Sequence, residues 1–313
     1  MSELRKDYIL NRWVLINEHR KKRPHQFKKP PESVKVKTCF FCPGNEETTP
    51  PEIGRVEYKG NWKIRWFPNL FAAVNTKENL KCVNSKHFTH CYGYGYHEVI
   101  AETPYHNKQL ADLSIEDIKD LLNVYSVRIK ELSKRKNVKY VSVFKNHGPE
   151  GGTSIVHSHS QIVTLPRIPS LVMDEVEAIK KFKRCPYCDI IKKEKKSQRR
   201  IVENHSFVAF APYASRFNYE AWIFPKKHVR NITEFDDKEL LELAFVLKKI
   251  LIKIKSLGLS YNYYLHYSPM NENLHFHIEV IPREAIWAGF EYSSNIIINS
   301  ISPESAAKFY RSR

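Results

Sequence analysis

One rare pattern occurs twice in this chain. The sequence HSHSQ at residues 157–161 recurs 118 residues later as HFHIE at residues 275–279. The same landmarks precede each copy in the same order: a Cys-x2-Cys pair, an apolar strand bearing a Glu, a single His and an amphipathic helix. Independent segments rarely keep four landmarks in register, so the chain is interpreted as a duplicated domain.

The landmarks divide the chain into two predicted repeats, residues 1–170 and 171–313. Corresponding positions are Cys39 with Cys185, Cys42 with Cys188, Glu98 with Glu220, His106 with His228, and Ser114 with Asp236. Short runs of β-branched and aromatic residues predict strands at 13–16, 99–101, 140–144, 162–163, 221–224 and 277–281. We therefore expect an α+β fold in which an antiparallel sheet carries one long helix per repeat.

The two long helices have clear start signals. Ser114 with Asp117, and Asp236 with Glu239, are capping-box pairs that open runs of apolar residues at helical spacing. Gly258 is available to end the second helix. The basic stretch at 192–200 is interpreted as a solvated loop between strands.

Four of the six cysteines lie in the two Cys-x2-Cys pairs. The chain shows no signal peptide and no apolar span, so we expect a cytoplasmic protein that does not enter a membrane, a setting in which paired cysteines bind metal more often than they form disulfides. Two thiolates and two imidazoles complete the tetrahedral set of a structural Zn²⁺ site. The sequence predicts two such sites: Cys39, Cys42, His106 and His157, and Cys185, Cys188, His228 and His275. One zinc ribbon shared by both pairs and a redox role are less favoured alternatives, and Cys82 and Cys91 have no predicted role.

The formal net charge of +17 favours an anionic partner. Lys and Arg are spread along the whole chain, and no RNA-binding aromatic motif or zinc-finger spacing occurs. Nucleic acid is therefore a less favoured partner than a phosphorylated small substrate.

The histidine doublet of the first repeat predicts an active site. On a strand, His157, His159 and Gln161 point to one face, so zinc binding by His157 leaves His159 free. The alternatives for His159 are a third metal ligand or a buried, hydrogen-bonded structural residue. The preceding segment 146–154 (NHGPEGGTS) suits a loop whose backbone N–H groups hold phosphate oxygens, whereas its counterpart 268–273 has no glycine. The first repeat is therefore expected to be catalytic and the second degenerate.

Neutral imidazole is a good nucleophile toward phosphorus and leaves readily from a protonated phosphoramidate. These properties favour a two-step group transfer through His159. Gln161 is expected to donate to a phosphoryl oxygen, with Ser154 and the loop amides sharing the developing charge.

These residues resemble the galactose-1-phosphate uridylyltransferase family of the histidine-triad superfamily. The resemblance covers nearly the whole chain and rests on residues 12–16 (RWVLI), 19–24 (HRKKRP), 39–45 (CFFCPGN), 67–72 (FPNLFA), 146–161 and 288–291 (AGFE). It implies two tandem histidine-triad-like half-barrel repeats. It also implies that His159 takes UMP from UDP-glucose, releasing glucose 1-phosphate, and passes it to galactose 1-phosphate.

The resemblance assigns further residues to the site. The implied nucleotide- and phosphate-binding residues are Phe67, Asn69, Phe71, Asn146, Gly152, Ser154 and Gln161, with Arg20 and Arg23 reaching a sugar phosphate across a homodimer interface. The implied sugar-binding residues are Gly289, Phe290 and Glu291.

The chain also departs from the family pattern. Ser158 replaces a Pro, Leu70 replaces an acid near the ribose, and the segment after Glu291 lacks a glutamine that contacts the hexose in bacterial enzymes. Bacterial relatives hold their second metal with a Glu and three histidines, here Glu175 or Glu177 with His266, His275 and His277. The thiolate set is favoured, as in the branch that includes ADP-glucose phosphorylases.

Three functions therefore remain open. The leading one is UDP-glucose–hexose-1-phosphate uridylyl transfer. The second is an ADP-sugar or dinucleoside polyphosphate phosphorylase of the same superfamily. The third, least favoured, is a zinc-stabilised nucleic-acid-binding protein.

Overall fold

One large antiparallel sheet organises the chain. The computed structural model describes residues 2–6, 13–17, 39–77 and 80–312, so Arg20 and Arg23 lie outside the described residues. The sheet has ten strands in the order β10-β11-β12-β14-β13-β8-β9-β7-β4-β3, and all neighbouring strands in it are antiparallel. The strands are β3 (Gly54–Tyr58), β4 (Asn61–Pro68), β7 (His97–Ala101), β8 (Tyr140–His147), β9 (His159–Leu165), β10 (Arg200–Glu203), β11 (Phe207–Phe210), β12 (Ala221–Pro225), β13 (Tyr261–His266) and β14 (His277–Pro282).

Each half of the chain contributes five strands in the same relative order. Outward from the centre of the sheet, the first half runs β8-β9-β7-β4-β3 and the second runs β13-β14-β12-β11-β10. The halves join where β8 pairs with β13, from Tyr261 opposite His147 to Tyr264 opposite Phe144. The two histidine doublets therefore occupy corresponding places on either side of this seam.

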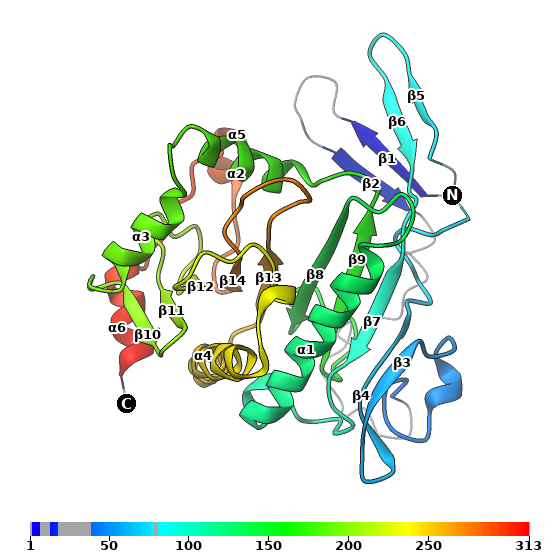
Figure 1. Cartoon of the computed structure of the whole chain (residues 1–313), viewed down its shortest axis with the longest axis horizontal. Coiled ribbons are helices and arrows are strands. Elements are labelled where there is room, and N and C mark those ends of the chain that lie inside the picture. Colours follow the sequence, from blue (N-terminus) through cyan, green and yellow to red (C-terminus); the bar gives the residue numbers. More distant parts are fainter. Residues whose placement is uncertain (1, 7–12, 18–38, 78–79, 313) are drawn as a thin grey trace.

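The two long helices form where the sequence predicts them and lie side by side on one face of the sheet (Figure 1). They are α1 (Ile115–Leu132) and α4 (Asp237–Ser256). Ser114 and Asp117 form a reciprocal capping box at the start of α1, as Asp236 and Glu239 do for α4. Gly258 follows α4 with a φ of +67°, a left-handed conformation that glycine adopts without strain.

Strand alternation separates the helix face of the sheet from an opposite face. Ile100 and Ile162 belong to the core that includes buried residues of α1 and α4. Val99 and Ala101, their neighbours along or across the strands, instead pack with Cys39 and Phe41 in a smaller cluster. Because successive side chains of a strand point to opposite faces, β9 directs His159 and Gln161 away from the helices.

The second half carries more helix than one per repeat. Its additional helices are α2 (Ser170–Lys180), α3 (Pro186–Glu194), α5 (Gly289–Ser294) and α6 (Pro303–Arg311). The prediction of a loop at 192–200 was wrong for its first part, because α3 extends to Glu194. Arg199 pairs with the buried Glu194 at 2.8 Å and with Glu304 of α6 at 2.8 Å, which ties the end of α3 to the C-terminal helix.

A four-stranded sheet projects beside the main one (Figure 1). It contains β1 (Ser2–Lys6), β2 (Trp13–Asn17), β5 (Cys82–Asn84) and β6 (Thr89–Tyr92). Cys82 lies opposite Cys91 in the β5–β6 ladder and forms a disulfide with it. The remaining elements are the short 3-10 helices η4 (Glu46–Thr48), η5 (Leu110–Asp112) and η6 (Ile232–Glu234).

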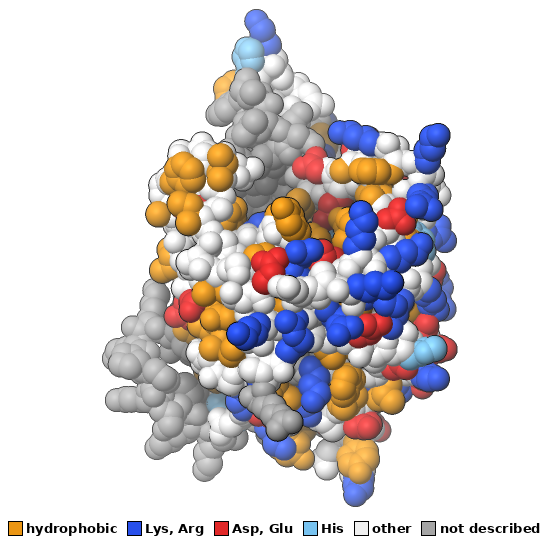
Figure 2. All heavy atoms as spheres, turned by 90° about the vertical axis from the view of Figure 1, so that its left-hand side faces the viewer, with side chains coloured by type: hydrophobic (Ala, Val, Ile, Leu, Met, Phe, Trp, Pro, Cys, Tyr) orange, Lys and Arg blue, Asp and Glu red, His pale blue; other side chains and the backbone are white. Residues whose placement is uncertain are grey.

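On the face that carries α3 and α6, positive charges are mixed with other side chains and do not form one patch. Figure 2 shows Lys and Arg side chains there interspersed with Asp, Glu and hydrophobic side chains. Several of the cations are paired, including Arg184 with Asp189 and Lys195 with Glu203. Among the described helices, none is both long and apolar enough to cross a membrane.

A buried ion pair joins α1 to the sheet. Glu98 of β7 accepts hydrogen bonds from Arg128 Nε at 2.9 Å and from Arg128 Nη2 at 2.7 Å. Both side chains are less than 5% exposed, and Arg128 also pairs with the half-exposed Glu131, so Glu98 is the member left without a partner when the pair is broken. Loss of one member of such a pair leaves an uncompensated buried charge.

We expect Arg128→Ala to lower the free energy of unfolding by about 3–5 kcal/mol because it strands the Glu98 carboxylate. The matched control is Arg55→Ala, which breaks the solvent-accessible Arg55–Glu52 pair and costs about 1 kcal/mol or less. Urea denaturation followed by circular dichroism measures both. Equal effects of the two substitutions would contradict the role given to the buried pair.

Candidate active site

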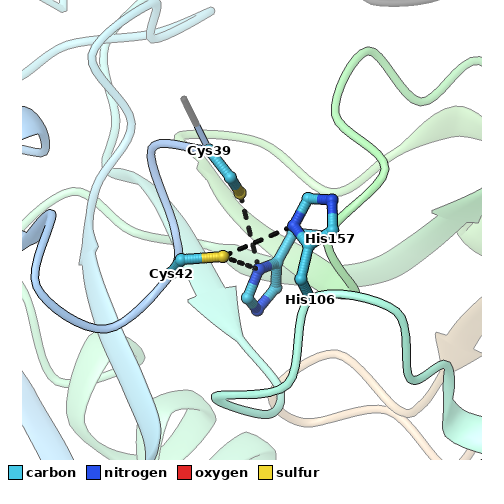
Figure 3. A group of neighbouring side chains, drawn as sticks. All are labelled: Cys39, Cys42, His106 and His157. Atoms are coloured by element: carbon cyan, nitrogen blue, oxygen red, sulfur yellow. Dashed lines mark hydrogen bonds between the residues drawn. The ribbon is translucent and has the colours of Figure 1, made fainter. Parts of the chain in front are cut away.

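The four predicted ligands of the first metal site lie together (Figure 3). Cys39 and Cys42 come from the turn before η4, His106 from the loop after β7, and His157 from the bend before β9. The His157 Nδ1 atom lies 3.5 Å from each sulfur, and the His106 Nδ1 atom lies 3.4 Å from Cys42 Sγ. All four residues are buried.

This geometry fits a tetrahedral zinc ion. With Zn–S near 2.3 Å and Zn–N near 2.0–2.1 Å, the sulfur–nitrogen edge of a tetrahedron is about 3.6 Å. The His157 Nε2–H group donates to the Thr103 carbonyl at 2.7 Å, which leaves Nδ1 unprotonated and available to a metal. Burial raises the pKa of Cys42 to about 12, so metal binding at neutral pH must displace the thiol proton.

The second predicted group is also assembled, with lower burial. Cys188 Sγ lies 3.5 Å from His228 Nδ1 and 3.6 Å from His275 Nδ1, and Cys185 Sγ lies 3.9 Å from His275 Nδ1. The two cysteines and His228 are partly exposed, whereas His275 is fully buried. His275 Nε2 donates to the Pro225 carbonyl at 3.1 Å and thereby repeats the arrangement at His157.

The alternative Glu and His ligands form a separate third group. Glu175, His266, His277 and Glu279 bring their ligand atoms within 4.8 Å of one another. His275 belongs to the thiolate group instead, and Glu177 is an exposed partner of Lys180. The structure thus separates two sets that the sequence presented as alternatives.

His159 is oriented by its own strand. Its Nδ1–H group donates to the His157 carbonyl at 2.8 Å, so the lone pair of the neutral ring is on Nε2. Burial lowers the pKa of His159 to about 4, which keeps the imidazole neutral at physiological pH. His157 itself precedes β9, so the expected row of three same-face residues is formed only by His159 and Gln161.

His159 lines a pocket on the open face of the sheet. Five more predicted residues line it, namely Phe67, Asn69, Phe71, Ser154 and Gln161. The pocket is also lined by Leu70, which the family resemblance placed near the ribose. Sequence reasoning did not assign the remaining lining residues to the site, which are Phe40, Phe41, Thr48, Thr49, Pro50, Val99 and Ile155. The Phe41 ring meets His159 edge-on at a centroid distance of 5.3 Å, which brings the Cys-x2-Cys turn into contact with this histidine. The pocket lining is therefore mostly apolar, and its polar members are Thr48, Thr49, Asn69, Ser154, His159 and Gln161.

A buried histidine that sequence reasoning missed contacts the polar end of the pocket. His97 Nε2 lies 2.9 Å from Gln161 Oε1 and 3.1 Å from Asn69 Nδ2. His97 Nδ1 accepts from the backbone N–H of Ala73 at 2.9 Å. The only sequence signal was its position two residues before Val99, which places both side chains on the same face of β7.

Ser158, which replaces the proline expected from the family, is held by a buried ion pair. Its hydroxyl donates to Glu102 at 2.5 Å, and Lys145 Nζ donates to the Ser158 hydroxyl at 3.0 Å and to the His159 carbonyl at 3.2 Å. Lys145 and Glu102 pair at 2.5 Å with almost no exposure. Polar contacts therefore restrain this segment of backbone where a proline ring would otherwise do so.

The glycine-rich loop is compact, but two of its amides are already used. The N–H of Gly152 donates to the Pro149 carbonyl at 2.9 Å, and the N–H of Thr153 donates to the Gly148 carbonyl at 3.3 Å. Gly148 has a φ of +74° and approaches Ser260 too closely for a side chain. In this conformation the loop satisfies the Gly152 amide internally, and the predicted phosphate contact of Gly152 stays a prediction.

Asn146 and the predicted sugar-binding residues lie outside this pocket. The Asn146 side-chain oxygen accepts from Asn262 Nδ2 at 2.8 Å, and the same nitrogen donates to the Gly151 carbonyl at 2.7 Å. Gly289, Phe290 and Glu291 lie on α5, and none of the three lines the pocket of the same chain.

The corresponding place in the second half is filled. Trp222 pairs with Glu279 as Val99 pairs with Gln161, so a large ring replaces a small side chain. This ladder is shifted by one residue from the expected correspondence of Glu98 with Glu220. The Phe224 ring stacks on His277 at a centroid distance of 4.7 Å, and Arg216 pairs with Glu279. Aromatic rings and an ion pair thus occupy the space that the pocket occupies in the first half.

Comparisons with known proteins match both halves of the chain. The family model of the galactose-1-phosphate uridyl transferase N-terminal domain matches residues 1–169, and the family model of the C-terminal domain matches residues 171–285. ADP-glucose phosphorylase from Arabidopsis thaliana is 35% identical over 99% of this chain and 92% of its own length. Galactose-1-phosphate uridylyltransferase from Thermotoga maritima is 31% identical over 99% of this chain and 98% of its own length.

Solved structures extend the similarity to the fold. The crystal structure of the Arabidopsis thaliana ADP-glucose phosphorylase with bound ADP-glucose has a TM-score of 0.79 at 32% identity, covering 100% of this chain and 99% of that one. A uridylyltransferase structure has a TM-score of 0.82 at 28% identity, covering 98% and 97%. The chain belongs to the galactose-1-phosphate uridylyltransferase family.

Proposed function

We propose that this protein transfers a nucleoside monophosphate from a nucleoside diphosphate sugar to a phosphate-bearing acceptor, with His159 as the transient carrier. The observation that carries this proposal is the neutral His159 ring. Its Nδ1–H group is anchored on the His157 carbonyl, and its Nε2 atom is left for the pocket that Gln161 also lines. A nucleophile, a fixed ring orientation and an amide donor are the parts that such a transfer requires.

The reaction proceeds in two displacements. The Nε2 lone pair of His159 attacks the α-phosphorus of the donor, and the bond from that phosphorus to the bridging oxygen breaks to release a sugar 1-phosphate. A phosphate oxygen of the acceptor then attacks the phosphoramidate, and Nε2 departs with its lone pair restored. The Nδ1–H bond to the His157 carbonyl stabilises the positive ring while the nucleotide is attached.

The other predicted site residues keep distinct roles in this proposal. Gln161 and Ser154 donate to the nonbridging oxygens, and Phe67, Asn69 and Phe71 hold the base and ribose. Asn146 and Gly152 contact the nucleotide phosphates after the loop rearranges on binding. Arg20, Arg23, Gly289, Phe290 and Glu291 would act on the sugar phosphate in a homodimer, where a second copy can bring them to the pocket.

Two substrate pairs fit the proposal. UDP-glucose with galactose 1-phosphate is the pair expected from the family resemblance and from the relatives named as galactose-1-phosphate uridylyltransferases. ADP-glucose with inorganic phosphate is favoured by the 35% identity to an ADP-glucose phosphorylase. Both use the same bond changes at His159 and differ in the base and in the acceptor.

We further propose one Zn²⁺ ion in each thiolate group. Cys39, Cys42, His106 and His157 would hold the first ion, and Cys185, Cys188, His228 and His275 the second. Each ion would act as a structural crosslink between its Cys-x2-Cys segment and the His doublet. The first would fix the peptide of His157, to which His159 is hydrogen bonded.

The matching strand orders of the two halves support a duplicated half-barrel unit with its boundary near residue 170. The first repeat would be catalytic and the second structural.

A nucleic-acid-binding role is not favoured, because cations on the face in Figure 2 are mixed with acidic side chains and several are paired. A cytoplasmic location stays a prediction.

Mixing the protein with donor labelled with ³²P at the α-phosphate should leave label on the protein that is stable to alkali and labile to acid, as expected for a phosphoramidate. His159→Asn should show none, and its turnover should fall by a factor on the order of 10⁴ or more because the nucleophile is lost. Labelling of both proteins to the same extent would exclude His159 as the carrier.

A panel of donors and acceptors distinguishes the two substrate pairs. Burst release of sugar 1-phosphate should occur with UDP-glucose or with ADP-glucose, and the better acceptor should be galactose 1-phosphate in the first case and inorganic phosphate in the second. Product analysis by anion-exchange chromatography makes the measurement. No burst with any nucleoside diphosphate sugar would refute the proposed class of reaction.

Metal analysis tests the two zinc sites. The purified protein should contain two zinc ions per chain, and Cys42→Ser and Cys188→Ser should each contain one. Zinc affinity at the first site should rise with pH, because burial raises the pKa of Cys42 and binding must release that proton. Unchanged zinc content in both variants, measured by mass spectrometry of the metal, would rule out these ligand sets.

A further inference from the structure

We infer that His97 is a positioning residue that fixes the amide of Gln161, with its N–H groups directed at the transferred phosphoryl group. This inference rests on the proposed function and adds a residue to it. His97 lies on β7 and is 5% exposed, and it touches Gln161 and Asn69 rather than a metal group.

The tautomer of His97 follows from its neighbours. The Ala73 backbone N–H can only donate, and it lies 2.9 Å from His97 Nδ1. That nitrogen therefore carries a lone pair, and in the neutral ring the proton is on Nε2. His97 Nε2–H accordingly donates to the Gln161 side-chain oxygen at 2.9 Å.

The Asn69 side-chain oxygen accepts from the Phe71 backbone N–H at 2.8 Å, so its amide nitrogen faces His97 Nε2 at 3.1 Å and Gln161 Oε1 at 3.5 Å. Because the proton of neutral His97 is on Nε2, only the Gln161 oxygen can accept from Asn69 Nδ2. The oxygen of Gln161 is thus the shared acceptor of His97 Nε2–H and Asn69 Nδ2–H. A flipped Gln161 amide would place three donors together, so the flipped state is disfavoured.

The consequence is that the Gln161 side-chain N–H groups are directed toward the phosphoryl group that is transferred to His159. Gln161 lines the pocket with His159, and across the described parts of the chain no hydrogen-bond partner is found for Gln161 Nε2. An amide whose orientation is set before the substrate arrives stabilises developing charge without reorganising during the reaction. His97 should therefore affect the rate of nucleotide transfer to His159 more than the affinity for the donor.

Three substitutions of His97 distinguish the contribution of its Nδ1 acceptor from that of its Nε2–H donor. His97→Phe keeps a ring but removes both polar atoms. His97→Asn retains an acceptor near the Nδ1 position, whereas His97→Gln extends a donor toward the Nε2 position. Single-turnover transfer should slow about 10- to 100-fold in His97→Phe and in His97→Asn, and His97→Gln should recover most of the loss.

A double-mutant cycle with Gln161→Ala separates positioning from general destabilisation. Gln161→Ala alone should slow transfer about 100- to 1000-fold, and His97→Phe should add almost nothing in that background. Thermal unfolding of every variant is measured in parallel, and the exposed His205→Phe serves as the matched control. Additive effects of His97→Phe and Gln161→Ala would overturn the inference, as would a wild-type transfer rate in His97→Asn.

The histidine tautomer gives a readout that needs no activity. Long-range ¹H–¹⁵N spectra of the wild-type protein should show His97 as the neutral Nε2–H form, and the Nδ1–H form would overturn the inference even if His97→Phe fails to fold. If the wild-type protein forms no nucleotidyl-His159, the proposed function fails while this spectrum still decides the hydrogen bond. If the intermediate forms at equal rates in wild type, His97→Asn and His97→Gln, the role of His97 alone is refuted.

Discussion

The hydrogen bond from His159 Nδ1 to the His157 carbonyl is the interaction on which the site depends. It joins the proposed nucleophile to a residue whose own ring is fixed at both nitrogens, by the Thr103 carbonyl on one side and by Cys39 and Cys42 on the other. Because the two histidines are only two positions apart, fixing the first also fixes the second. A neutral imidazole, with a pKa held low by burial, is thereby presented to the pocket in one tautomer.

The two halves of the main sheet match each other in strand order. Both halves order their five strands identically, and both place a doublet histidine beside a Cys-x2-Cys pair. The second half encloses His277 with the rings of Trp222 and Phe224 and neutralises Glu279 with Arg216. The seam between β8 and β13 makes this closed half a continuation of the sheet that supports the open one.

Helix-capping residues and the spacing of potential metal ligands made part of this arrangement predictable from the sequence. Capping boxes placed α1 and α4, and the spacing of Cys and His identified both thiolate groups, because ligands of one site must be brought together whatever the connecting loops do. Contacts made only in the folded chain could not be predicted in this way. The Ala73 N–H donates to His97 Nδ1 and the Gly152 N–H donates to the Pro149 carbonyl, and neither contact leaves a pattern in the sequence. The helical start of the 192–200 segment was missed because its many lysines suggested a solvated loop, whereas Glu194 and Arg199 form an ion pair in the folded chain.

The most direct test of the central claim is the identity of the nitrogen that carries the nucleotide. The protein labelled with ¹⁵N at histidine can be mixed with its donor and examined by ³¹P NMR for coupling between phosphorus and a ring nitrogen. The account predicts one phosphoramidate signal, coupled to Nε2 of His159 and absent from His159→Asn. Coupling to an Nδ1 atom, or turnover of the donor with no phosphoramidate at any histidine, would contradict it.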